Sequence, residues 1–142
     1  MKFGDISDMA VSGLVAQRAR LAATASNLAN AQTTRTPEGG PYRRRDPVFG
    51  TAPIGGPFAA VLERSFERVT LEGVSYDQRP PTLRYDPGHP DADASGMVAL
   101  PNVNVVEEVT NLLSASRSFE ANLAVLRKVR DMAQATLQIG RA

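Results

Sequence analysis

The chain has 142 residues and a formal net charge of +1, is 42% apolar and contains no cysteine. This length suits a single domain, and the near-neutral charge provides no whole-protein field to attract nucleic acid or an anionic membrane. The absence of cysteine excludes disulfides, thiolate zinc sites and cysteine nucleophiles. No apolar run approaches the roughly 20 residues that span a bilayer, and residues 1–5 lack the apolar core of a cleaved signal peptide.

All ten prolines fall between Pro37 and Pro101. Because proline interrupts helices, both ends of the chain are free to form long ones. We therefore expect an N-terminal helix in residues 1–32, a Pro/Gly-rich loop and small β region in residues 33–101, and a long C-terminal helix in residues 102–142. The expected fold is mainly α with a small β-rich insert, the two helices forming a coiled-coil-like α-domain.

The first helix is predicted from about residue 5 to residue 30. Leu14, Leu21 and Leu28 repeat every seven residues and place an apolar stripe on one face. By pattern alone this stripe fits an ordinary core face as well as a contact with another subunit. The turn-forming residues that follow should end the helix near Asn30.

The middle of the chain carries short strand signals. Alternating apolar and polar residues predict strands at 68–72, continued at 74–76, and at 82–85, whereas 58–66 is compatible with strand or helix. These strands are too few to bury one another, so a small irregular β region is expected rather than a sandwich.

The C-terminal helix has the strongest pattern. Asn104 and Glu107 are spaced like a capping box at its start. Steps of four and three residues then define a coiled-coil-like seam, eight of whose ten positions are apolar: Val105, Val109, Leu112, Ser116, Phe119, Leu123, Leu126, Arg130, Ala133 and Leu137. About 36 helical residues extend for about 54 Å, more than the roughly 39 Å of the first helix. Part of the seam should therefore be covered by other subunits.

Two segments contain residues that also occur in metal-binding or catalytic sites. The start of a calcium-binding loop is imitated by Asp91, Asp93, Ser95 and Gly96. The twelfth position is Asn102 rather than a bidentate glutamate, so an acidic turn with local side-chain bonds is the better interpretation. The only histidine, His89, lies between Gly88 and Pro90 and reads as a loop residue. We expect no catalytic, cofactor or metal site and no small-molecule substrate.

A short basic run, Arg43 to Arg45, follows Tyr42. It can contact an anionic partner, such as phosphate or an acidic neighbouring subunit, or it can be a solvated loop. Nucleic-acid binding gains little support because no broad basic face or aromatic stacking platform accompanies the run.

Five segments, in order along nearly the whole chain, resemble the signatures of the bacterial flagellar axial and rod proteins, in the form found in the proximal rod. They are residues 27–31, 33–43, 85–90, 101–108 and 114–122. Phe119 and Met97 stand where tyrosine is common in that family, and the match is weaker between Gly50 and Gln78.

The resemblance implies a structural subunit, not an enzyme, of the proximal rod of the flagellar basal body. Such a subunit assembles helically around the export channel and transmits motor torque toward the hook. The implied partners are copies of itself, the rod proteins FlgB, FlgF and FlgG, the rod adaptor FliE and the flagellar type III export apparatus. The implied location is the periplasmic rod, reached by export without a cleaved signal peptide.

Two sets of residues are predicted to contact neighbouring subunits. The helix set is Leu14, Leu21, Asn27, Leu28, Asn30, Val109, Leu112, Phe119, Leu123 and Leu126. The loop set is Thr36, Pro37, Gly39, Gly40, Pro41, Tyr42, Arg43, Arg44 and Arg45. The alternative function is a soluble coiled-coil adaptor or a basic-loop binding module. Nucleic-acid affinity that falls steeply with salt would favour the basic-loop module.

Overall fold

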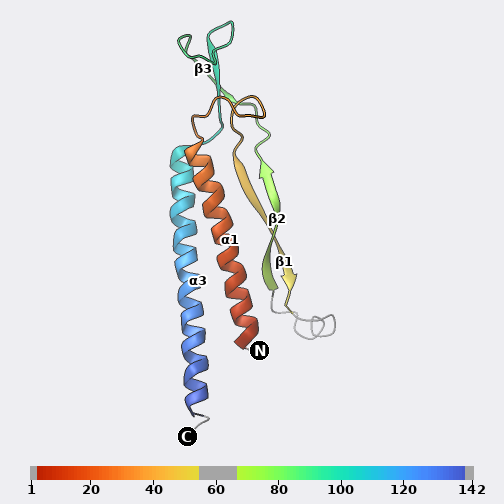
Figure 1. Cartoon of the computed structure of the whole chain (residues 1–142), viewed down its shortest axis with the longest axis vertical. Helices are drawn as coiled ribbons and strands as arrows, with labels where there is room; N and C mark the ends of the chain where they lie inside the picture. The colour runs from red at the N-terminus through yellow and green to blue at the C-terminus, as the bar shows by residue number, and fades with distance from the viewer. Residues whose placement is uncertain (1–2, 55–66, 140–142) are drawn as a thin grey trace. The chain divides into compact units, whose positions relative to one another are not determined.

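The computed structural model describes residues 3–54 and 67–139. Its elements follow in the order α1 (Phe3–Ala29), β1 (Arg45–Pro53), β2 (Glu67–Tyr76), β3 (Thr82–Tyr85), β4 (Met97–Leu100) and α3 (Val105–Ile139) (Figure 1). The expected class, long terminal helices around a small β region, is confirmed. Residues 58–66, whose pattern was ambiguous, and Gly140, the expected end of the second helix, lie outside the described residues.

The chain divides into two compact units that each take a part of both helices. One contains Met1–Ala19, Val48–Gly73 and Ser114–Ala142, and the other contains Arg20–Pro47 and Val74–Leu113. We call them the first and the second unit. In the described part of the chain, no helix is long and apolar enough to cross a membrane.

In the first unit, small residues bring α1 and α3 close together. A Cβ atom placed on Gly13 of α1 would lie 2.8 Å from Nδ2 of Asn122 in α3, so the amide side chain occupies the space that glycine leaves open. The two helices run in opposite directions (Figure 1). The buried apolar side chains of this unit are mostly alanines: Ala10, Ala16, Ala115 and Val129. A helix pair with so little buried surface is weakly held by its own contacts.

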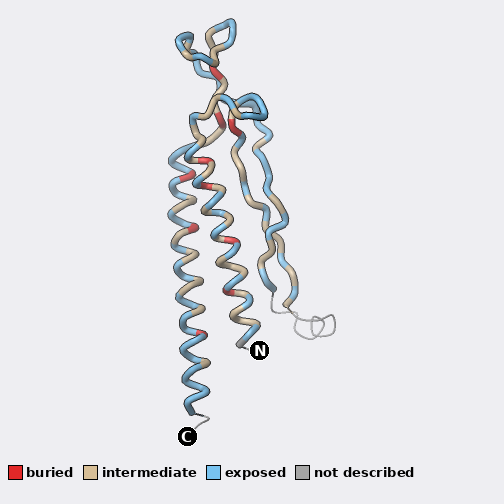
Figure 2. The backbone as a smooth tube through the Cα atoms, viewed as in Figure 1, coloured by how far each residue is buried: buried red, intermediate tan, exposed pale blue. Residues whose placement is uncertain are grey.

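Six of the ten predicted seam positions on α3 are half-buried: Leu112, Ser116, Phe119, Leu123, Leu126 and Ala133. Other seam positions, including Val105, Val109 and Leu137, are exposed (Figure 2). The most buried residues of α3 are Glu108, Ala115 and Val129, and none of them belongs to the seam. The most buried line of α3 is therefore rotated from the predicted seam, toward a side whose small and polar residues carry little hydrophobic signal.

Local hydrogen bonds explain where the helices begin and end. The Asn30 side chain donates to the Ser26 carbonyl over 2.9 Å and accepts from the Thr33 hydroxyl, which closes the last turn of α1. Oδ1 of Asn104 accepts from the amide of Val106 at 3.0 Å. Asn104 is therefore the N-cap of α3, as its position beside Pro101 predicted.

The β region consists of two sheets of two strands each, β1 with β2 and β3 with β4. The second sheet is antiparallel and pairs Thr82 with Leu100 and Tyr85 with Met97. The predicted strands correspond to β2 and β3, whereas β1 and β4 were not predicted. Strand β1 contains Pro47 and Pro53, which a two-stranded sheet tolerates because each strand has a free edge. Strand β4 has only four residues and no alternating pattern.

Candidate functional site

The candidate site lies in the second unit, where the end of α1, the loop after it and the start of α3 meet. We call this region the junction and define it by Asn27, Tyr42, Arg44, Arg45 and Glu108. Asn27 comes from the last turns of α1, and Glu108 from the first turn of α3. The other three residues precede or begin β1. The junction therefore connects segments that lie far apart in the sequence.

Asn27 is the centre of the junction, and its side chain is only 1% exposed. Its Oδ1 accepts from the Arg45 amide at 2.8 Å and from the Tyr42 hydroxyl at 3.0 Å. Its Nδ2 donates to the Arg45 carbonyl at 2.9 Å and to Oε2 of Glu108 at 3.2 Å. An amide side chain offers two acceptor and two donor positions, so every one is used. Asn27 thereby holds the loop and α3 to the end of α1.

Glu108 is a buried carboxylate, also 1% exposed, and is compensated by Arg44. Nε of Arg44 lies 2.6 Å from Oε1 of Glu108, and the Arg44 guanidinium also pairs with Asp46. Burial acts to lower the pKa of Arg44, but its hydrogen bond to Glu108 and the charge of Asp46 raise that pKa overall. Arg44 therefore has its charge balanced within the chain.

Arg45 is held between two aromatic rings. Its guanidinium carbon lies 5.5 Å from the centroid of Tyr42 and 5.6 Å from that of Tyr76. Both distances fit cation–π contacts. Together with the two backbone bonds to Asn27, these contacts make Arg45 a structural residue.

The loop between α1 and β1 is closed on itself. The Tyr42 amide donates to the Thr33 carbonyl at 3.0 Å, and within the loop the Thr36 amide donates to the Gly40 carbonyl at 2.9 Å. Gly39 and Gly40 have φ values of 90° and 74°, in the left-handed region that glycine adopts without strain. The loop is thus ordered by its own hydrogen bonds.

The acidic turn between β3 and β4 also contacts this loop. Oδ2 of Asp91 accepts from the Thr34 hydroxyl at 2.8 Å, and Arg35 lies 3.8 Å from the same carboxylate. Oδ1 of Asp93 accepts from the amides of Ser95 and Met97 at 2.8 and 2.9 Å. The interpretation as a turn with local side-chain bonds is confirmed. Within the described ranges, no group of three His, Cys, Asp or Glu side chains could hold a metal ion.

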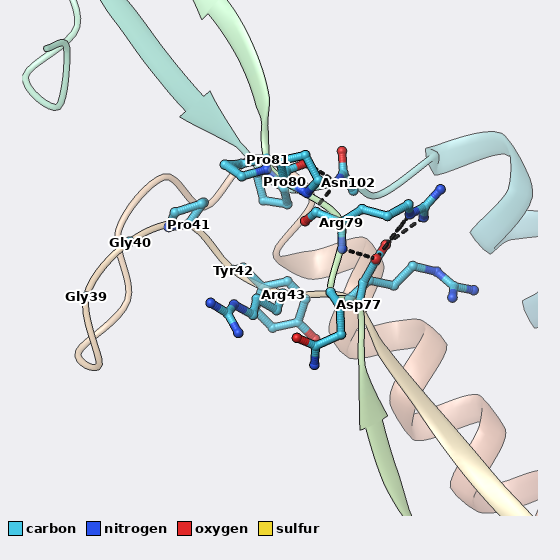
Figure 3. A pocket seen from close by; sticks show the side chains of 13 residues that line it. Gly39, Gly40, Pro41, Tyr42, Arg43, Asp77, Arg79, Pro80, Pro81 and Asn102 are labelled. Atoms are coloured by element: carbon cyan, nitrogen blue, oxygen red, sulfur yellow. Dashed lines mark hydrogen bonds and ion pairs between the residues drawn. The ribbon is translucent and has the colours of Figure 1, made fainter.

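A hollow of about 290 Å³ opens beside the loop (Figure 3). Its walls are rich in proline: Pro41, Pro80, Pro81 and Pro101. Asp77 and Arg79 form an ion pair on one side, with Nη2 of Arg79 2.5 Å from Oδ2 of Asp77. The hydrogen bonds that Arg79 donates lower the pKa of Asp77 from 3.8 to about 2. The guanidinium of Arg43 lies on the opposite side from this pair.

The structure separates the predicted contact residues into two groups. Leu14, Leu21 and Leu28 are half-buried on α1, Leu112, Phe119, Leu123 and Leu126 are half-buried on α3, and Val109 is 38% exposed. Asn27, Tyr42 and Arg44 were predicted to contact neighbours, yet their side chains serve contacts within the chain. These three belong to the junction, where Asn27 and Tyr42 are buried, Arg44 is half-buried, and each is already bonded.

Glu108 is the junction residue that the sequence analysis did not select. It was read only as one of two acidic residues near the start of the second helix. The available signal was its spacing, because Glu108 stands four residues before Leu112 on the face that contacts α1. A lone carboxylate on an apolar face indicates a buried partner of opposite charge.

Family models of known proteins match both ends of the chain. Residues 8–35 match the family model described as flagella basal body rod protein, and residues 94–139 match the model described as flagellar basal body rod FlgEFG protein C-terminal. The flagellar basal-body rod protein FlgC of Salmonella typhimurium is 43% identical over 136 residues, which cover 96% of each chain. The FlgC of Borreliella burgdorferi is 40% identical over 142 residues, with 93% of each chain covered. The chain belongs to the FlgC family of flagellar basal-body rod proteins.

Membership of the FlgC family makes the chain a structural rod subunit of the flagellar basal body. The FlgC of Escherichia coli O157:H7 supports the same assignment, at 44% identity over 142 residues and 96% of each chain. The resemblance seen in the sequence is thereby confirmed. The residues matched by the first family model include Asn27, and those matched by the second include Glu108.

Proposed function

We propose that the chain is a proximal-rod subunit that assembles helically around the export channel and transmits motor torque toward the hook. The observation that carries the proposal is the apolar surface left uncovered on both helices. Exposed apolar side chains on α1 are Val11 and Val15. Those on α3 are Val105, Val106, Val109, Leu113, Val125, Met132, Leu137 and Ile139.

The unequal lengths of the helices add to this surface. In the first unit Gly13 lies beside Asn122, so the described start of α1 at Phe3 is level with about Met132 of antiparallel α3. Residues 134–139 of α3 are all exposed. Burying an apolar side chain contributes about 1.5–3 kcal/mol, so a neighbouring helix would gain substantially by covering these positions.

Contacts between different faces of successive subunits build a helical filament when the rotation between subunits does not close a ring. Alanine-rich helices approach one another closely, which favours a stiff tube. We infer that α1 and α3 form the wall of this tube. The proposed neighbours are copies of the chain, the rod proteins FlgB, FlgF and FlgG, and the adaptor FliE.

We also infer that the chain reaches the periplasmic rod through the flagellar type III apparatus without a cleaved signal peptide. Mass spectrometry of the chain recovered from basal bodies would detect the intact N-terminus. A trimmed N-terminus would contradict this route.

A charge at a predicted contact position tests the assembly itself. Leu123 on α3 is one of these positions, and it is half-buried in the single chain. Leu123→Asp should abolish rod assembly and swimming while the protein is still expressed and exported. The neighbouring, exposed Ala124→Asp adds the same charge and serves as the control. Rods that form normally with Leu123→Asp would contradict the proposed wall.

A further inference from the structure

The three consecutive arginines of the loop have three different environments. Arg44 neutralises the buried Glu108, and Arg45 is stacked between two tyrosine rings. Arg43 is exposed, and no hydrogen bond or ion pair joins it to any described residue. Arg43 is therefore the member of the run whose charge is left for another molecule.

Arg43 stands where two hollows meet. It lines the proline-walled hollow of about 290 Å³ and a second one of about 350 Å³ that Gln78 also borders. Glu38 lines the second hollow, but no ion pair links it to Arg43. We call the two hollows together the Arg43 groove. Of the other cations that line it, Arg79 pairs with Asp77, Arg44 pairs with Glu108, and Arg45 is stacked between two tyrosine rings.

We propose that the Arg43 groove binds an acidic side chain, Asp or Glu, on a neighbouring rod subunit. This inference rests on the proposed function, in which the chain is surrounded by other rod subunits, and it specifies the residue and the chemistry of one contact with them. A planar guanidinium binds a carboxylate through two parallel hydrogen bonds. The prolines of the walls have no backbone N–H, so the walls contribute few donors that could replace the Arg43 guanidinium.

The charge distribution favours a single carboxylate over a polyanion. The chain has a net charge of +1, and the neighbouring arginines already have partners within the chain. Nucleic acids are bound by several uncompensated cations at once, which this groove does not provide. The closed loop also keeps the Arg43 backbone in place before binding, which reduces the entropy lost in the contact.

Charge reversal in the full-length protein, expressed from its own locus, tests the inference. Arg43→Glu should abolish swimming and incorporation into basal bodies, and Arg43→Lys should retain part of both because it keeps the charge without the planar fork. The melting temperature of Arg43→Glu should match that of the parent, because the side chain has no partner within the chain. Swimming of Arg43→Glu at the parental rate would overturn the inference.

Photo-crosslinking identifies the partner without relying on a destabilised variant. A benzoylphenylalanine in place of the exposed Gln78, which lines both hollows, keeps Arg43 and should join, in assembled basal bodies, a segment of a rod subunit that contains Asp or Glu. Replacing that carboxylate with Lys should then restore swimming to Arg43→Glu. A crosslink only to nucleic acid or to a segment without a carboxylate would overturn the inference.

The outcomes separate this inference from the proposed function. If basal bodies contain the chain and Leu123→Asp blocks assembly, but Arg43→Glu swims normally, only the Arg43 contact is wrong. If basal bodies lack the chain altogether, the proposed function fails as well. Arginine replacements should be made singly, because a triple alanine variant would also remove the Arg44 ion pair and the Arg45 stacking.

Discussion

At the scale of single residues, the junction depends on buried polar groups that satisfy one another. Asn27 uses all four of its hydrogen-bonding positions, and the buried Glu108 carboxylate pairs with Arg44. Leaving a buried charge without its partner strongly lowers the free energy of unfolding. Removing an exposed charge that has no partner changes that free energy little. Adjacent arginines should therefore differ sharply in their effect on stability.

Replacing Arg44 with Ala should lower the free energy of unfolding by about 3–5 kcal/mol, because Glu108 would stay buried without its cation. Urea denaturation followed by circular dichroism measures the change. The matched control is Arg43→Ala, which removes an exposed side chain and should change stability by less than about 0.5 kcal/mol. Equal effects of the two substitutions would show that the Arg44–Glu108 pair is not a buried support.

Asp77 should titrate well below an ordinary aspartate. Its hydrogen bonds from Arg79 lower its pKa from 3.8 to about 2 in the folded protein. A carboxylate with a lowered folded pKa stabilises the fold above its unfolded pKa, and that contribution is lost as the pH falls from about 4 to about 2. Carboxyl NMR should give a midpoint near 2, and Arg79→Ala should return it toward 3.8. An unchanged midpoint in that variant would contradict the assigned cause.

At the scale of elements, the sheet of β3 and β4 depends on its turn. The β3–β4 hairpin has few residues and is closed by a bond from the Asp86 amide to the Gly96 carbonyl at 2.9 Å. Gly96 has a φ of 76°, and the Tyr85 ring lies over it. The same turn contributes Asp91, whose carboxylate binds the loop after α1. The shape of the hairpin therefore influences the loop that presents Arg43.

Gly96→Ala should destabilise this hairpin by more than about 1 kcal/mol, because a side chain is strained at that φ. The new Cβ would also lie 2.9 Å from Cε2 of Tyr85 and 3.2 Å from Cβ of Pro87. The Tyr85 ring resonances and urea denaturation would report the change. Gly88→Ala is the control, because its Cβ would meet nothing closer than Asp86 Oδ1 at 3.9 Å. Equal stability of the two variants would contradict the role assigned to Gly96.

At the scale of the whole molecule, the chain buries polar contacts at the junction but leaves apolar surface along its helices. Val11 and Val15 of α1 are 48% and 59% exposed, and Leu137 and Ile139 of α3 are 70% and 79% exposed. Apolar surface on this scale indicates contact with other proteins. A subunit of this kind is completed by its neighbours.

The end of α3 should be the least protected part of that helix in the free protein. Amides of the exposed residues 134–139 should exchange with solvent almost as fast as in a peptide, since the described part of α1 does not extend beside them. Amides near Glu108 and Leu112 should exchange much more slowly, because the junction holds them. Hydrogen exchange read by mass spectrometry tests this difference. Uniform strong protection to Ile139 in the monomer would contradict it.

Much of the secondary structure could be predicted because it depends on local signals. The positions of proline, the heptad spacing and Asn104 define the two helices, and alternation reveals β2 and β3. Strand β1 could not be predicted, since its prolines are acceptable only at a sheet edge. The orientation of α3 was also only partly predicted, because Ala115 and Asn122 contribute through close approach rather than through hydrophobicity.

The sequence by itself determined the fold class and the family, because both depend on the order of residues along the chain. Only the tertiary structure decided which polar residues support the junction and which are left for partners. Arg43, Arg44 and Arg45 are chemically identical, and their roles differ because Glu108 and Tyr76, distant in sequence, lie beside only two of them. The spatial arrangement of charges follows from folding and cannot be read from a run of identical residues.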